Sequence, residues 1–71
     1  MTKEQFAALE ALVDAISLPG VLDALEVMAH EKGAHIATNW QDDELASRWE
    51  LAGSIVGEAV WQMREKAALP E

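Results

Sequence analysis

The segment from Asn39 to Glu50, NWQDDELASRWE, constrains the fold of this 71-residue chain more than any other. Asn39 belongs to a residue type that tolerates the left-handed backbone conformation in which helices often end. Asp42 suits the N-cap of a following helix, and the two acidic residues after it suit the first turn, where the helix dipole is positive. Leu45 and Trp49 then begin an apolar stripe at helical spacing. The segment therefore predicts a tight turn between two antiparallel helices.

The rest of the chain also reads as helix, because no segment alternates between apolar and polar residues at strand spacing. The predicted helices span about residues 3–16, 18–38 and 42–67. Thr2 and Gln5 match a capping box at the first helix start. Ser17 is the predicted N-cap of the second helix, with Pro19 in its first turn, where the missing amide costs nothing. We expect one all-α domain over residues 1–71, an antiparallel helical hairpin with a short N-terminal helix.

Each predicted helix carries an apolar stripe, and large residues in these stripes are expected to form the core or a dimer seam. These residues are Phe6, Leu25, Met28, Trp49, Val56 and Met63. Gly53 and Gly57, four residues apart, are expected to mark a close contact between helices. Hydrophobic residues make up 51% of the chain, which is more than a lone small helical domain usually has room to bury. The sequence therefore predicts a helical-bundle homodimer.

Charge and composition exclude several classes of partner. Thirteen acidic and five basic residues give a formal net charge of −8, which phosphate backbones and anionic membrane surfaces repel. We therefore expect neither a nucleic acid nor a membrane as partner. No cysteine is present, which removes disulfides and thiolate zinc sites. The start of the chain has no long apolar run, so neither a signal peptide nor a membrane span is predicted, and a cytoplasmic location is expected.

The histidines do not match a metal motif. His30 and His35 are five residues apart, and on a helix such residues point about 140° away from each other. A zinc-protease pair is four apart and shares one face. The sequence offers no catalytic constellation either, so we expect no enzyme, no cofactor, no metal ligand and no catalytic residue. Lys32 interrupts an apolar stripe near His35, and a metal or small-ligand site around these two residues remains an alternative.

Three large apolar residues are candidates for contact with a partner protein, namely Trp40, Ile55 and Trp61. Trp61 falls off the main stripe of the third helix, among polar neighbours. Either the first helix covers it or it lies at an interface, where tryptophan is a common anchor. With Ile55 it is expected to define a second apolar face. The leading functional prediction is a small protein–protein interaction module, such as an adaptor, an accessory subunit or a regulator.

A second reading uses the acidic turn. Asp42, Asp43, Glu44 and Glu50 would bind a basic surface, as in an antitoxin, an acidic inhibitor or a nucleic-acid mimic. Association of this kind would slow steeply with added salt. An apolar contact through Trp61 would show little salt dependence, so the two readings are separable.

The block from Gly20 to Gly53 resembles a group of small uncharacterised bacterial helical proteins. The shared elements are a VL-x-x-L segment, an EK-x-x-H segment and an Asn-Trp-Gln-Asp turn followed by a tryptophan. The matching residues here are Val21-Leu22 with Leu25, Glu31-Lys32 with His35, Asn39-Trp40-Gln41-Asp42, and Trp49. The resemblance implies a helical fold and no particular activity. The expected architecture is also similar to the helical-hairpin dimer of the plasmid regulator Rop, by analogy of shape only.

Overall fold

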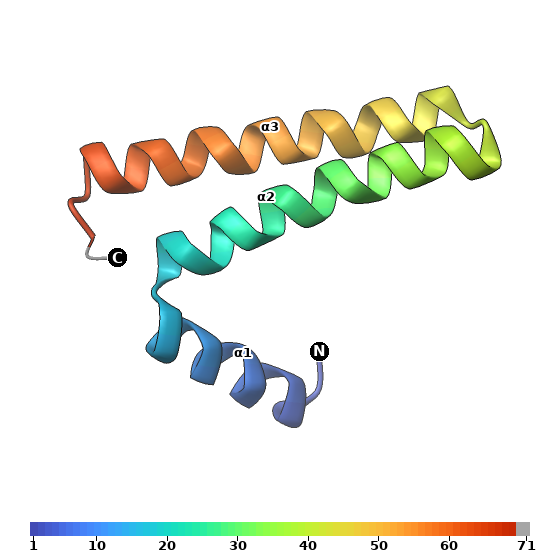
Figure 1. Ribbon diagram of the computed structural model, residues 1–71. Helices are drawn as coiled ribbons and strands as arrows, with labels where there is room; N and C mark the ends of the chain where they lie inside the picture. The colour runs from blue at the N-terminus through green and yellow to red at the C-terminus, as the bar shows by residue number, and fades with distance from the viewer. Residues whose placement is uncertain (70–71) are drawn as a thin grey trace.

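The computed structural model describes residues 1–69, so the last two residues of the predicted domain lie outside the described part. This part is helical without strands, which confirms the predicted all-α class. Its elements are α1 (Lys3–Ile16), α2 (Leu18–His35), the π-helix η1 (Ile36–Trp40) and α3 (Asp43–Glu65). The helices α2 and α3 lie side by side and run in opposite directions, whereas α1 stands away from them at an angle (Figure 1).

The helix α1 begins and ends where the sequence predicted. The backbone amide of Gln5 donates to the hydroxyl of Thr2 at 3.1 Å, and the Thr2 amide donates to the Gln5 side chain at 2.8 Å. This reciprocal pair is the predicted capping box. It satisfies two backbone groups at the free end of the helix, which therefore begins sharply at Lys3.

The turn before α3 differs from the prediction at two points. The helical segment does not end at Asn39 but continues through Trp40 as η1, and the left-handed residue is Gln41, with φ 54°. The side-chain amide of Asn39 donates to the His35 carbonyl at 3.1 Å, so this asparagine stabilises the wider turn instead of ending the helix. The predicted cap of α3 is confirmed, because the amide of Leu45 donates to the Asp42 carboxylate at 3.0 Å.

The buried core differs from the predicted one. None of the six large residues expected there is buried in the single chain: three are exposed and three are half-buried. The buried hydrophobic residues of the described part are Val21, Ala29, Ile36, Ala46 and Val60, with Pro19, Gly33 and Gly53 buried among them. The large residues therefore do not form a core within one chain, their place in a dimer seam stays a prediction, and the contact between α2 and α3 is made mainly by small residues.

Glycines explain why large side chains do not fit between α2 and α3. A Cβ atom on Gly33 would lie 3.1 Å from the backbone oxygen of Ala46. A Cβ atom on Gly53 would lie 2.8 Å from the ring of His30, and one on Gly57 would meet the Glu26 carboxylate. The predicted close contact at Gly53 and Gly57 is therefore confirmed. Because the two helices approach so closely, the large residues beside the contact stay on the outside.

The junction between α1 and α2 is a single strained residue. Ser17 has φ 130° and ψ 161°, a region of backbone conformation that is essentially reserved for glycine. Its hydroxyl nevertheless accepts a hydrogen bond from the Gly20 amide at 3.0 Å, which confirms its predicted role as the N-cap of α2. Ser17 thus combines a favourable cap with an unfavourable backbone, and it sets the angle at which α1 leaves the other helices.

Two substitutions of Ser17 separate these effects. Ser17→Ala loses the cap and keeps the strain, so we expect it to lower the free energy of unfolding by about 1 kcal/mol. Ser17→Gly removes strain that costs about 1–3 kcal/mol and gives up only a few tenths of the capping energy. Glycine also adds conformational entropy to the unfolded chain, which costs about 0.5–1 kcal/mol. The free energy of unfolding of Ser17→Gly should therefore match or exceed that of the wild type. Urea unfolding followed by circular dichroism tests this order, and equal destabilisation by both changes would contradict it.

Candidate functional site

Most of the large apolar side chains of α1 are exposed. They form one stripe along the helix, made of Phe6, Leu9, Leu12 and Ile16, beside the half-buried Val13. No residue of α1 is buried, and within residues 1–69 this helix packs against α2 alone. Sequence reasoning found the stripe but assigned Phe6 to a core or dimer seam, and the single chain provides no cover for it.

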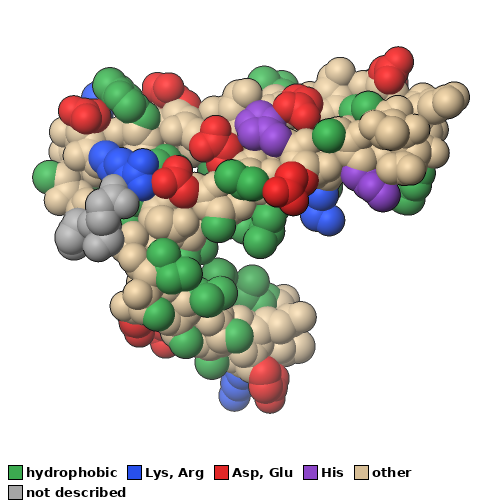
Figure 2. Space-filling model, in the orientation of Figure 1, with side chains coloured by type: hydrophobic (Ala, Val, Ile, Leu, Met, Phe, Trp, Pro, Cys, Tyr) green, Lys and Arg blue, Asp and Glu red, His purple; other side chains and the backbone are tan. Residues whose placement is uncertain are grey.

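The exposed stripe continues onto α2. Leu18 and Leu25 are both exposed at more than a third of their surface. Figure 2 shows hydrophobic side chains on the sides of α1 and α2 that border an open gap between α1 and the α2–α3 pair. We call the α1 stripe together with Leu18 and Leu25 the open face. The open face is a candidate surface for contact with another protein, because large exposed apolar patches typically mark such sites.

The three predicted contact residues are all exposed. Trp40, Ile55 and Trp61 each keep more than half of their surface accessible. Since α1 makes no contact with α3 in the described part, α1 does not cover Trp61 in the single chain. Ile55 and Trp61 are six residues apart on α3, which separates their directions by about 120°. They therefore do not form the single second face that the sequence suggested.

The acidic residues of the turn have local structural roles. Asp42 caps α3, and Asp43 and Glu44 lie in its first turn, exposed to solvent. Glu44 accepts from the guanidinium of Arg48 at 2.7 Å, an exposed pair of the kind that contributes less than about 1 kcal/mol. Helix formation accounts for the acidic run, and the acidic-inhibitor reading stays a prediction without a geometric feature of its own.

A second cluster joins α2 to α3. The Nδ1 atom of His30 donates to the carboxylate of Glu50 at 2.5 Å, while its Nε2 atom lies 3.8 Å from the carboxylate of Glu26. Glu26 lies four residues before His30 on the same helix, whereas the partner on α3 depends on the register between the helices. Gly53 makes room for the ring. Among residues 1–69 no group of three or more potential ligands could hold a metal ion.

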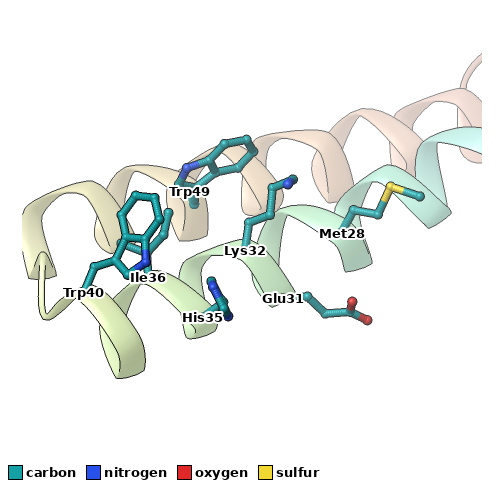
Figure 3. A pocket seen from close by; sticks show the side chains of 7 residues that line it. All are labelled: Met28, Glu31, Lys32, His35, Ile36, Trp40 and Trp49. Atoms are coloured by element: carbon teal, nitrogen blue, oxygen red, sulfur yellow. The ribbon is translucent and has the colours of Figure 1, made fainter.

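A pocket lies near the turn that joins α2 to α3 (Figure 3). It is an open pocket with a volume of about 510 Å³, within the usual range of small-molecule sites. The residues that line it are Met28, Glu31, Lys32, His35, Ile36, Trp40 and Trp49. The predicted contact residue Trp40 thus lies beside Lys32 and His35, which the sequence had singled out separately. Trp49 was expected in the core or a dimer seam, and in the single chain it is half-buried in the pocket wall.

Comparison with protein-family models, with curated proteins and with solved structures gives no match to this chain. None of the helices within residues 1–69 combines the length and the apolar character needed to cross a bilayer. The open face and the pocket near the turn are the two candidate binding sites of the described residues.

Proposed function

We propose that this chain is a small protein–protein interaction module, and that its open face binds a second copy to form a helical-bundle homodimer built on the α2–α3 hairpin. The observation that carries the proposal is the state of α1: it is a regular helix with a continuous apolar stripe and no buried residue. The module would then present its remaining surface to further partners, as an adaptor, an accessory subunit or a regulator does.

The limited stability that α1 would have on its own supports this proposal. An isolated helix of 14 residues is only marginally stable in water, even with good local signals. Amphipathic helices in proteins obtain most of their stability by burying the apolar face. In the single chain α1 has only α2 as a neighbour and leaves Phe6 and Leu12 about half exposed or more. A second chain over the open face would supply the missing burial.

The exposed area gives the amount of burial that is missing. A compact monomer of 7.8 kDa has an accessible surface of roughly 4,400 Å². This chain exposes 5,318 Å², and its radius of gyration of 14.1 Å compares with about 11 Å for a compact domain of its length. The excess of roughly 900 Å² is close to the burial per partner in a standard interface, about 800 Å². A second copy of the same shape therefore fits the size of the open face.

Symmetry also favours a second copy as the occupant. Closed dimers use the same patch on both chains, so the patch must be able to cover itself. The open face joins a stripe on α1 to exposed leucines on α2, and a two-fold axis through the gap would place each stripe against the other chain's leucines. An interface of this kind would be mainly apolar and of standard size.

Light scattering or sedimentation equilibrium tests the proposal on the whole chain. The wild type is expected to have the mass of two chains over a wide concentration range. Phe6→Glu places a charge in the open face, where it would be buried unpaired in the dimer, so the variant should be monomeric. An acidic residue in the first turn of α1 favours the helix dipole, and Phe6 is 59% exposed in the single chain, so the fold of the protomer should survive.

Leu51→Glu is the matched control, because Leu51 is 62% exposed on α3, which lies outside the open face. It should leave the dimer intact. A wild type that is monomeric at all concentrations would refute self-association. Equal loss of the dimer in both variants would mean that the contact lies elsewhere on the chain.

A further inference from the structure

One aromatic wall of the pocket near the turn, Trp40, belongs to a segment with unusual backbone. On an α-helix Trp40 would point about 140° away from His35, because the two are five residues apart. In the π-helix η1 the hydrogen bonds span five residues, which brings such a pair to the same side. The ring centroids of His35 and Trp40 are 6.5 Å apart in an edge-to-face arrangement. Single π-helical turns are rare in proteins, and many of those that exist lie at functional sites.

Lys32 determines the charge that the pocket accepts. Its ammonium nitrogen lies 5.8 Å from the ring centroid of Trp49, and in Figure 3 the side chain extends toward this indole. A cationic ligand would have to displace the ammonium from the ring face, and it would be repelled by it. Lys32 has no salt bridge within residues 1–69, so its charge is available to an anion. The carboxylate of Glu31 points away from both indoles (Figure 3).

His35 adds an N–H donor. The side-chain amide of Asn39 donates to its Nδ1 atom at 3.0 Å, so Nδ1 accepts and Nε2 carries the N–H of the ring. The structure shows no other side-chain hydrogen bond of His35 in the described residues. The pocket therefore combines two indoles, the apolar Ile36 beneath them, one ammonium group and one N–H donor.

We propose that this pocket binds a small anion with a flat aromatic body, such as an aromatic carboxylate. The aromatic body lies against the indoles of Trp40 and Trp49, and the carboxylate accepts hydrogen bonds from Lys32 and His35. The pocket lies toward the turn end of α2 and α3, whereas the open face joins α1 to the first half of α2, with Leu25 about one turn before the pocket residue Met28. This proposal needs no residue from a second chain.

Titration with 1-naphthoate, followed by NMR of the three indole N–H signals, tests the site. The signals of Trp40 and Trp49 should shift together with a dissociation constant of about 0.1–1 mM, which is ordinary for a ligand of this size. The signal of Trp61 should stay in place. The neutral analogue 1-naphthamide, which matches the shape without the charge, should bind about fivefold more weakly.

Lys32→Met keeps the apolar stem and removes the charge, so it should weaken naphthoate about fivefold and leave naphthamide unchanged. Lys66→Met, outside the pocket, is the matched control and should change neither. The proposal is wrong if no signal shifts, if all three indoles shift alike, or if naphthamide binds as tightly as naphthoate. Circular dichroism of each variant confirms that the helices are retained.

Discussion

Replacement of Ile36 by alanine is expected to unfold a large fraction of the protein at room temperature. Ile36 is 8% exposed and is the largest side chain among the five buried hydrophobic residues of the described part. Truncation of a buried isoleucine to alanine costs about 2–5 kcal/mol, because transfer energy is lost and a cavity remains. The core of a domain of this size contributes only about 3–5 kcal/mol of net stability. Urea unfolding followed by circular dichroism measures the loss.

Leu51→Ala is the control for this change. It removes an apolar side chain of similar volume from a site that is 62% exposed, so its effect should stay within about 0.5 kcal/mol. If both variants lost the same stability, Ile36 would not belong to the core. A dimer would raise the stability of every variant with protein concentration, so the two are compared at one concentration.

The local signals in the sequence were sufficient to place the helices. The cap at Thr2, the cap at Ser17 and the cap at Asp42 each depend on residues within three positions, and all three are present in the structure. Such signals are fixed by backbone chemistry that does not depend on the rest of the fold. The exception is the end of α2. Asparagine can end a helix or support a wider turn. Here the Asn39 side chain bonds the His35 carbonyl and supports the wider turn.

The core was not predictable in the same way, because it depends on which sides of α2 and α3 face each other. Large and small apolar residues form neighbouring stripes on both helices, and either stripe could have closed the contact. The sequence contained the deciding signal in Gly33 and Gly53, since glycine on both helices permits an approach that excludes leucine and tryptophan. Periodicity gives most weight to large hydrophobic residues, so it pointed to the stripe of large residues, whereas small residues close the contact between α2 and α3.

The candidate pocket shows the same limit. The sequence pointed to Lys32 and His35 as one possible ligand site and to Trp40 as a contact residue, but Trp49 lies on the other helix. Its place opposite Lys32 follows from the register between α2 and α3, which no local pattern determines. Trp61 stands among polar neighbours, but the sequence left open whether α1 covers it, and the structure shows it exposed. Ile55 and Trp61 stay predictions as contact residues, because neither cover by α1 nor juxtaposition across helices follows from a local pattern.

Gly33→Leu should therefore damage the fold in a way that its helix propensity does not predict. Leucine is the better helix former by about 1 kcal/mol. At this site, however, the first added carbon would already lie 3.1 Å from the backbone oxygen of Ala46 and 2.8 Å from the carboxylate of Glu50. Four added carbons must separate the helices, at a cost of about 3 kcal/mol or more. The free energy of unfolding should fall by about 2 kcal/mol.

Ala34→Leu is the matched control, since it places the same side chain one residue further along α2 at an exposed site. Its effect should stay within about 0.5 kcal/mol. Loss of stability at residue 33 alone would mean that close backbone approach holds α2 against α3 and keeps the large apolar residues outside, where the open face needs them. Unchanged or increased stability of Gly33→Leu would mean that the helices separate without cost. The large apolar residues of α2 and α3 could then pack against each other within one chain, and a second copy would no longer be needed to bury them.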